Sequence, residues 1–477
     1  MESTGVAVPL CVDCDGTLVR TDLLHESTML LARASVWSLF KLPIWLMKGK
    51  AHLKQQLSMR VELNPASLPY NAEVVDLVRQ AQAQGRVTVL ATASPRAQAQ
   101  AVAQHLACFD RVEATDDDTN LSKGAKADRL EQLFGRGGFH YVGNSRDDLP
   151  VWASSAGAIV VSASKSLQRQ AAAAAPVLQV IEPPARSLKT YAKAIRVHQW
   201  LKNLLVFVPL FAAHQLTMPS IGAAMLAFIA FSMCASAVYV INDLLDLPSD
   251  RQHVRKRNRP FASGAIPIAR GVMIAPLLLL GAALIAMQLP ALFGAALLGY
   301  FVVTCLYSFW LKNQVIVDVL LLASLYTSRV IAGSAATAIA PSFWLLAFSM
   351  FMFLSLAIVK RYSEMLVTLA QNKAKAPGRG YMVSDLPVLV SLGTAAGYMA
   401  TLILALYVNN SDVAILYPRS WVLWLALPPL LYWISRVWMK AHRGEIPDDP
   451  VVFAATDKQS WILAVVIAAT LVAASMR

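Results

Sequence analysis

The 477-residue sequence contains few charged residues and few cysteines. Only 15% of its residues are charged and 56% are hydrophobic, which is more apolar than a typical soluble domain. Its five cysteines, at positions 11, 14, 108, 234 and 305, predict no disulfide framework. Because the N-terminus lacks a basic segment followed by an apolar one, we expect no signal peptide and a first domain that stays in the cytoplasm.

The apolar residues are concentrated in one part of the chain. Charged and apolar residues alternate up to about residue 171, whereas apolar runs with short polar breaks follow Leu204. We therefore predict a soluble domain at 1–170, an Ala- and Pro-rich linker at 171–190 and a membrane domain at 191–477. The net charge of +13 fits a membrane surface, and we expect no nucleic-acid partner because the cations are divided among the polar breaks.

The length and spacing of the apolar runs predict several membrane-spanning helices. A span needs about 20 predominantly apolar residues. The candidates are 203–217, 221–241, 271–289, 291–310, 315–335, 342–361, 387–408, 420–440 and 460–475. Cations fill the even-numbered connections, whereas the others together hold only Arg419. The positive-inside rule then predicts an inner-membrane protein whose N-terminal domain is cytoplasmic and whose C-terminus lies on the opposite side.

The second apolar run ends in INDLLDLPSD, residues 241–250, and a basic segment follows it. Asp243, Asp246 and Asp250 stand at i, i+3 and i+7, on one face of a helix unless Pro248 breaks it. A solvated acidic helix end is the simpler alternative. However, converging carboxylates repel one another without a cation, and oxygen ligands favour Mg²⁺, which bridges to phosphates. The cations expected to bind the remaining phosphate charge are Arg255, Arg257 and Arg259.

In this context NDLLDLPSD followed by RKRNRPFASG resembles the UbiA superfamily of membrane prenyltransferases, with its NDxxDxxxD motif. The resemblance covers Ala192 to about Leu471. It implies an all-α bundle of nine transmembrane helices, the UbiA fold, with a cavity at the cytoplasmic side. It also implies that Asn242, Asp243, Asp246 and Asp250 hold Mg²⁺ against a diphosphate.

Four further segments narrow the resemblance. RVHQWLKN, YSFWLKNQVIVDV, SRVIAG and KRYSE are similar to decaprenyl-phosphate phosphoribosyltransferases. This similarity implies phosphoribosyl diphosphate and a polyprenyl phosphate lipid as substrates, so the site must hold three anionic groups. The residues expected to contact them are Lys202, Asn203, Lys312, Asp318, Arg329, Lys360 and Arg361. Membrane anchoring is the alternative role for the terminal cations.

Two of these charges lie inside an apolar helix. Intramembrane charges are costly and usually face a polar cavity or one another. Asp318 and Arg329 are eleven positions apart, about three turns, so we do not expect them to pair with each other.

The second acidic motif of the family, usually DxxxD, is incomplete. The sequence has Tyr381-x-x-x-Asp385, and we expect these two residues to contact metal or phosphate. The departure favours the phosphoribosyl branch over the alternative, a prenyltransferase that joins a prenyl diphosphate to a small aromatic acceptor beside a regulatory N-terminal domain. A transporter is the competitor of another class, but transporters bind substrate near the bilayer midplane.

The N-terminal segments VDCDGT, VTVLATASP, KGAKADRL and FHYVGNSRDDLP together resemble the haloacid dehalogenase-like phosphatases. The resemblance implies a Rossmann-like α/β domain with a parallel sheet. Asp13 is then the nucleophile and Asp15 the general acid and base. Thr92 and Lys126 bind the phosphoryl group, and Mg²⁺ is held by Asp13, Asp15, Asn144 and Asp148.

This domain departs from its family at one position and carries an insertion. Asn144 replaces a usual aspartate, so we expect weaker metal binding, and a degenerate docking domain is the alternative. The insertion at about 23–68 predicts a small helical cap, whose Trp and Lys residues also suit a membrane surface. Together the halves predict a bifunctional Mg²⁺ enzyme that ribosylates a polyprenyl phosphate and then removes the 5-phosphate of the product.

Overall fold

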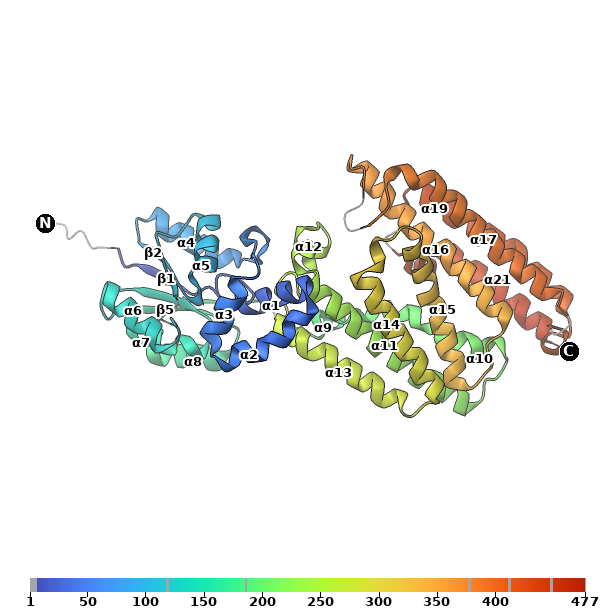
Figure 1. Ribbon diagram of the computed structural model, residues 1–477, viewed down its shortest axis with the longest axis horizontal. Helices are drawn as coiled ribbons and strands as arrows, with labels where there is room; N and C mark the ends of the chain where they lie inside the picture. The colour runs from blue at the N-terminus through green and yellow to red at the C-terminus, as the bar shows by residue number, and fades with distance from the viewer. Residues whose placement is uncertain are drawn as a thin grey trace. The chain divides into compact units, whose positions relative to one another are not determined.

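The structure is a computed structural model that describes residues 7–116, 120–184, 187–375, 379–410, 413–446 and 449–476 (Figure 1). The chain divides into two compact units. The first consists of Met1–Ile195 and Tyr239–Ala275, and the second of Arg196–Val238 and Pro276–Arg477. The segment that carries the aspartate motif thus belongs to the same unit as the N-terminal domain.

The N-terminal domain contains a six-stranded parallel sheet in the order β3-β2-β1-β4-β5-β6. The strands are β1 (Leu10–Val12), β2 (Thr88–Pro95), β3 (Arg111–Thr115), β4 (His140–Gly143), β5 (Gly157–Val161) and β6 (Val177–Ile181). Strands such as GAIVV are buried throughout, as expected for a parallel sheet covered on both faces. The predicted α/β fold is confirmed.

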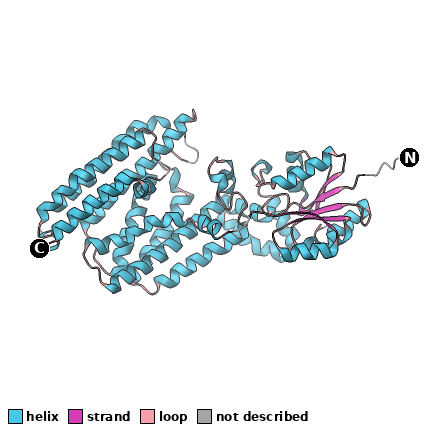
Figure 2. Ribbon diagram, turned by 180° about the vertical axis from the view of Figure 1, so that it is seen from behind, coloured by secondary structure: helices cyan, strands magenta, loops and turns pink. Residues whose placement is uncertain are grey.

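Alternate residues of the strands pack against different helices, as Figure 2 shows by the helices on both sides of the magenta strands. Val12, Leu90 and Val142 share a core with α4 (Ala72–Ala83) and α5 (Arg96–Leu106). Cys11, Val89 and Tyr141 face α6 (Gly124–Phe134), α7 (Leu149–Ser154) and α8 (Lys165–Ala174). The period of two along each strand produces this division.

The predicted linker, 171–190, is partly structured. Residues 171–174 complete α8, and β6 pairs in parallel with β5. The Ala and Pro content indicated a linker, but the run VLQVI within it has the β-branched and apolar residues that favour a strand. Residues 185 and 186 lie outside the described part of the chain.

The insertion forms the expected helical cap. It comprises α1 (Leu23–Ala34), η1 (Val36–Lys41), α2 (Leu42–Met47), α3 (Lys50–Ser58) and η2 (Pro65–Ser67). Asp22 caps α1 by accepting a hydrogen bond from the backbone N–H of Leu24. Leu31, Trp45, Leu53 and Leu57 form the cap's own small core.

The rest of the first unit surrounds the aspartate motif. It contains α9 (Leu188–Ala194), the end of α11 (Met218–Leu245), α12 (Leu247–Gln252), η5 (Lys256–Asn258) and the start of α13 (Ile268–Ala286). Pro248 lies in the first turn of α12, so the chain starts a new helix there. The aspartates therefore do not lie along one continuous helix.

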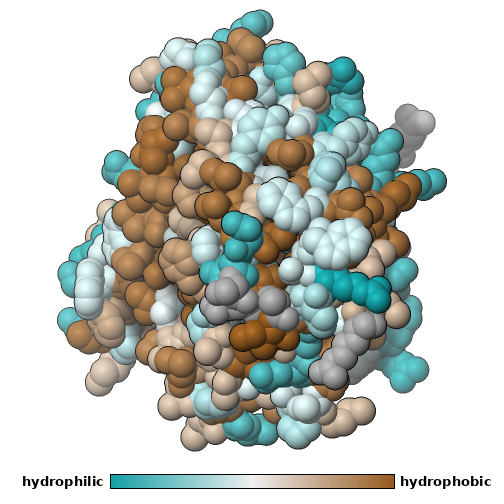
Figure 3. Space-filling view, turned by 90° about the vertical axis from the view of Figure 1, so that its right-hand side faces the viewer, coloured by the Kyte–Doolittle hydropathy of each residue, from teal (hydrophilic) through white to brown (hydrophobic). Residues whose placement is uncertain are grey.

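Within the described residues, eight helices are long and apolar enough to cross a membrane. They are Met218–Leu245, Ile268–Ala286, Ala291–Phe309, Val317–Thr337, Phe343–Ala370, Val383–Val408, Ser420–His442 and Lys458–Ser475. The all-α membrane fold is confirmed, with eight such helices where nine were expected. Hydrophobic side chains cover much of the face in Figure 3, as expected for a surface that contacts lipid.

The first expected span, 203–217, does not form one long helix. It is divided between η4 (Val197–Phe207) and α10 (Val208–Ala212), with Pro209 in the first turn of α10. Left-handed backbone at Arg196 and His214 bounds these short helices. Hydropathy alone could not reveal these breaks.

The second unit has further short elements between its spans. They are η6 (Leu311–Asn313), η7 (Val383–Asp385), α18 (Val413–Leu416) and α20 (Pro450–Thr456). Its principal helices include α14 (Ala291–Phe309), α15 (Val317–Thr337), α16 (Phe343–Ala370), α17 (Leu386–Val408), α19 (Leu427–His442) and α21 (Lys458–Ser475), with η8 (Ser420–Ala426) before α19.

Candidate active sites

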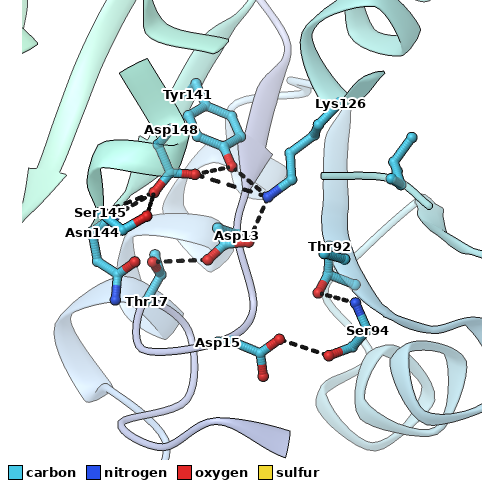
Figure 4. Close-up of polar contacts among 12 residues, drawn as sticks. Asp13, Asp15, Thr17, Thr92, Ser94, Lys126, Tyr141, Asn144, Ser145 and Asp148 are labelled. Carbon is cyan, nitrogen blue, oxygen red and sulfur yellow. Dashed lines mark hydrogen bonds and ion pairs between the residues drawn. The ribbon is translucent and has the colours of Figure 1, made fainter. Parts of the chain in front are cut away.

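The first candidate site lies at the carboxyl ends of β1, β2 and β4. The strand order reverses between β1 and β4, which is where open parallel sheets usually bind ligands. Asp13 follows β1, Thr92 lies in β2, and Asn144 follows β4. Lys126 comes from α6 and Asp148 from the short helix η3 (Arg146–Asp148), as Figure 4 shows.

A buried lysine joins the two principal carboxylates. Nζ of Lys126 lies 2.7 Å from Oδ1 of Asp13 and 3.8 Å from Oδ1 of Asp148. Lys126 also donates to the hydroxyl of Tyr141 at 3.0 Å, and this hydroxyl donates to Asp148 at 2.9 Å. Sequence reasoning missed Tyr141; its signal was the one hydroxyl in the strand β4, HYVG.

Burial sets the protonation behaviour of this group. It raises the pKa of Asp13 to about 7, although the charge of Lys126 opposes that rise. Burial alone would lower the pKa of Lys126, but the carboxylates of Asp13 and Asp148 outweigh it and raise the pKa. The lysine therefore stays cationic, and a further cation would favour ionised Asp13.

Asp15 is held apart from this cluster. Its Oδ2 accepts a hydrogen bond from Oγ of Ser94 at 2.6 Å, and its Oδ1 accepts one from the backbone N–H of Leu23 at 2.8 Å. Burial, followed by the charge of Asp22, raises the pKa of Asp15, which suits a proton donor. The side chain of Thr92 accepts a hydrogen bond from the backbone N–H of Ser94 at 3.0 Å, so Thr92 and Ser94 are linked near the end of β2 (Figure 4).

The residues at this edge fit a Mg²⁺ ion held by few carboxylates. Asp148 accepts hydrogen bonds from the backbone N–H groups of Asn144 and Ser145, which fixes its loop. A Cβ at Gly16, where φ is +76°, would lie 2.1 Å from Nδ2 of Asn144, so the amide packs directly against the nucleophile loop. Among the described residues no three His, Cys, Asp or Glu side chains are grouped to hold a metal, consistent with an amide at position 144.

The second candidate site is the aspartate motif. Nη1 of Arg259 donates to Oδ1 of Asp243 at 3.0 Å and to Oδ2 of Asp250 at 2.6 Å. Two carboxylates thus converge on one cationic nitrogen, and their oxygens have the chemistry that Mg²⁺ prefers. Burial raises the pKa of Asp250, and Arg259 opposes this rise.

The other expected ligands of this motif lie nearby in the chain. Asn242 is in the last turn of α11, and Asp246 joins α11 to α12; both are half-buried. Arg255 and Arg257 are exposed, before and within η5. Of these arginines, Arg259 is the one whose contacts with Asp243 and Asp250 are described above.

The second unit contains a buried polar cluster around Arg361. Its Nε lies 2.5 Å from Oδ2 of Asp318, and its Nη1 lies 2.5 Å from Oε2 of Glu364. The hydroxyl of Tyr381 donates to Oδ1 of Asp318 at 2.6 Å. The structure thus brings together Asp318, Arg361 and Tyr381. Tyr307, which accepts a hydrogen bond from Arg361 at 2.8 Å, was missed by sequence reasoning.

A second group in this unit involves Lys202 and Arg329. Lys202 forms an ion pair with Asp449, a residue that the sequence analysis did not single out. Nε of Arg329 donates to Oδ1 of Asn203 at 2.9 Å, and its Nη2 donates to Tyr300 at 3.3 Å. Asp318 and Arg329 thus have different partners, in agreement with their spacing.

Among the remaining predicted residues, Lys312 and Asp385 lie in the short helices η6 and η7, whereas Lys360 lies inside α16, which continues to Ala370 beyond the expected end at 361. The backbone carbonyl of Lys312 accepts a hydrogen bond from Arg379 at 3.2 Å. The charge of Lys360, after that of Lys202, helps to lower the pKa of Asp449 against the effect of burial. Asp385 accepts a hydrogen bond from the backbone N–H of Met382 at 2.8 Å, which caps η7. The binding roles of all these residues stay predictions.

A parallel α/β domain with this carboxylate–lysine edge, joined to membrane-length helices, defines a membrane enzyme with a hydrolase-like domain. The chain belongs to the UbiA prenyltransferase family, which it matches over residues 203–462. Residues 10–152 match the haloacid dehalogenase-like hydrolases. The predicted fusion is confirmed, and the chain is an integral membrane enzyme. Both families generally depend on Mg²⁺.

Several relatives share parts of this architecture. The chain is 34% identical to the uncharacterized protein y4nM of Sinorhizobium fredii over 98% of this chain and 91% of that protein. It is 34% identical to the nodulation protein NoeC of Azorhizobium caulinodans over 57% of this chain and 89% of NoeC. It is 35% identical to the decaprenyl-phosphate phosphoribosyltransferase of Mycobacterium tuberculosis over 39% of this chain and 63% of that enzyme.

Proposed function

We propose that the membrane domain transfers 5-phosphoribose from phosphoribosyl diphosphate to a polyprenyl phosphate, and that the N-terminal domain removes the 5-phosphate from the product. The observation that carries this proposal is the buried Asp13–Lys126 pair on the same chain as a UbiA domain. Ribosylation would supply that pair with a phosphomonoester. Similarity to the mycobacterial phosphoribosyltransferase supports the first step.

In the transfer step, an oxygen of the lipid phosphate bonds to the anomeric carbon of the ribose. The bond from that carbon to the diphosphate oxygen breaks, and diphosphate leaves with the electron pair. Asp243, Asp246 and Asp250 would hold Mg²⁺, which neutralises the departing diphosphate. Arg259 would then donate to the phosphate oxygens instead of the carboxylates.

In the second step, Asp13 attacks phosphorus and the bond from phosphorus to the ribose oxygen breaks. Asp15 donates its proton to the leaving oxygen and then takes a proton from the water that hydrolyses the aspartyl phosphate. Asp13, Asp148 and the amide oxygen of Asn144 would hold Mg²⁺, which offsets the repulsion between nucleophile and phosphate. Lys126 holds Asp13 in place at 2.7 Å.

The distribution of cations supports a single side for both reactions. The polar breaks on the side of the N-terminal domain hold the cations, so both sites would face the cytoplasm of an inner membrane. A shared membrane face would raise the local concentration of the lipid product at the phosphatase.

The test combines purified full-length protein with Mg²⁺, phosphoribosyl diphosphate and a polyprenyl phosphate, and identifies lipid products by mass. We expect ribosyl-phosphopolyprenol from the native chain and its 5-phosphorylated form from Asp13→Asn. Asp128→Asn, an exposed change on α6, is the matched control. Absence of any ribosylated lipid would refute the transfer, and an unchanged product from Asp13→Asn would refute the phosphatase step.

The alternative reaction is prenyl transfer to a small acceptor, which the family match over residues 203–462 favours. A parallel reaction with radiolabelled prenyl diphosphate and an aromatic acceptor distinguishes the two. Prenylated product without ribosylated lipid would establish this alternative.

A further inference from the structure

A buried ion pair joins the N-terminal domain to the aspartate motif within the first compact unit. Nη2 of Arg251, on α12, lies 2.5 Å from Oε1 of Glu26, on α1, and Nη1 lies 3.1 Å from Oε2. Only 7% of the arginine side chain and 4% of the glutamate side chain are exposed. The two residues are 225 positions apart in the chain, so this bidentate pair is a tertiary contact.

Two further contacts hold the same surfaces together. A Cβ at Gly264, where φ is +72°, would lie 2.7 Å from Cβ of Arg20 and 2.9 Å from its carbonyl oxygen, so only glycine permits this approach. Met29 of α1 packs against the hydrophobic cluster that contains Leu244 and Phe261. The loop after the aspartate motif is therefore packed against α1 and the turn before it.

Each partner of the ion pair is close in the chain to residues that contact a candidate site. Glu26 lies in the first turn of α1, whose Leu23 N–H donates to Asp15. Arg251 follows Asp250, and its Nε donates at 2.8 Å to the carbonyl of Ala262, three residues after Arg259. Displacement of Arg251 would therefore move both sides of the Arg259–Asp250 contact.

We infer that Glu26 and Arg251 are positioning residues through which the N-terminal domain holds the aspartate motif in its diphosphate-binding conformation. The inference rests on the proposed diphosphate role of the motif but not on the identity of the donor. Removing one partner of a buried ion pair leaves an unpaired charge, so α12 would shift to expose the remaining group. The N-terminal domain is then a structural part of the transferase as well as a second enzyme.

The test uses the full-length chain in lipid nanodiscs and compares Glu26→Gln, Arg251→Lys and the exchanged pair Glu26→Arg with Arg251→Glu. Lys165 and Glu182 form an ion pair at 3.0 Å in the same domain, but both are exposed, so Glu182→Gln is the matched control. The first readout is KM against kcat for whichever diphosphate donor reacts. The second readout is the affinity for inorganic diphosphate in the presence of Mg²⁺. Only the binding that is lost in Asp243→Ala is attributed to the aspartate motif.

We expect Glu26→Gln to raise the donor KM and weaken diphosphate binding by roughly tenfold or more, since breaking a buried pair is costly. The exchanged pair should recover much of this loss, whereas Glu182→Gln should match the native chain. A Glu26→Gln protein whose folded fraction keeps the native diphosphate affinity and donor KM would overturn the inference.

The diphosphate measurement separates this inference from the proposed function. If phosphoribosyl diphosphate is not a substrate but Glu26→Gln weakens diphosphate binding, the proposed reaction fails and the positioning role stands. If ribosylation occurs and Glu26→Gln does not alter diphosphate binding, the proposed reaction stands and the positioning role fails. Thermal unfolding of each variant identifies proteins that fail to fold, and the conservative Arg251→Lys then supplies the comparison.

Discussion

Two buried cations, Lys126 in the N-terminal half and Arg329 in the membrane half, are surrounded in opposite ways. In the haloacid dehalogenase-like site, Lys126 is the cation that contacts both Asp13 and Asp148. In the membrane half, Arg329 donates to neutral groups, the amide of Asn203, the hydroxyl of Tyr300 and the carbonyl of Leu325. The first arrangement has surplus negative charge and favours a metal ion. The second has surplus positive charge and favours phosphate groups.

The aspartate motif combines both arrangements, because Arg259 lies between Asp243 and Asp250. An arginine at this place offsets part of the charge of the two carboxylates. Asp243 and Asp250 would hold Mg²⁺, which would supply positive charge for diphosphate, and Arg259 would donate to the phosphate oxygens. We therefore predict that Mg²⁺ replaces Arg259 as the cation beside these carboxylates when diphosphate binds, so that no buried charge is left unpaired.

Replacement of both Asp243 and Asp246 by alanine should have the largest effect. Loss of a metal that supplies several kcal/mol predicts a fall of about 10³-fold or more in the transfer rate. Phosphatase activity toward a soluble phosphomonoester should persist. If the transfer reaction and its Mg²⁺ dependence survive in this variant, the aspartate motif does not hold the catalytic metal. Asp385→Asn, at a residue that caps η7, should cost far less.

The next largest effect is expected from Asp318→Asn. The change leaves Arg361, which is almost fully buried, without one of its two carboxylates. Breaking a buried pair predicts a loss of about 3 kcal/mol in the free energy of unfolding. Unfolding in detergent should show this loss relative to Asp385→Asn. Equal stability of the two variants would mean that Glu364 alone balances the arginine.

The sequence predicted the candidate catalytic and binding residues but not most of the side chains that contact them. NDLLDLPSD and the four phosphatase segments identified both families, because metal and phosphate chemistry requires particular residues at short spacings. Tyr141, Asp449 and Glu26 were missed because their partners are brought close only by the fold. The division of 203–217 into η4 and α10 was missed for a different reason, since hydropathy does not report backbone conformation.

A smaller effect should follow from Asn144→Asp, which sharpens the contrast between the two metal sites. A carboxylate in place of the amide should strengthen Mg²⁺ binding, by roughly tenfold if Asn144 is a ligand. Mg²⁺ titration of phosphatase activity measures this change, and Asn120→Asp, an exposed change in the same domain, is the control. If the Mg²⁺ requirement is equal in both variants, Asn144 does not contact the metal.

The smallest effect concerns the outer face of the cap. Trp37, Phe40, Ile44 and Met47 on η1 and α2 are exposed, and Met47 is 89% exposed. The sequence from Ser27 to Val61 contains no Asp or Glu, but it does contain six cations: Arg33, Lys41, Lys48, Lys50, Lys54 and Arg60. Aromatic residues beside lysines favour the headgroup region of an anionic membrane. We therefore expect this face of the phosphatase domain to contact lipid.

Labelling of Met47→Cys by a water-soluble thiol reagent measures that contact in the full-length chain. Surface attraction of about 1 kcal/mol predicts labelling roughly fivefold slower in anionic than in neutral nanodiscs. Ser166→Cys, exposed on α8, should label equally in both, and Trp37→Ser with Phe40→Ser should remove the difference at position 47. If Met47→Cys labels at one rate in both lipids, the cap face does not bind the membrane. The two halves would then differ in lipid contact as well, since only the UbiA half would contact lipid.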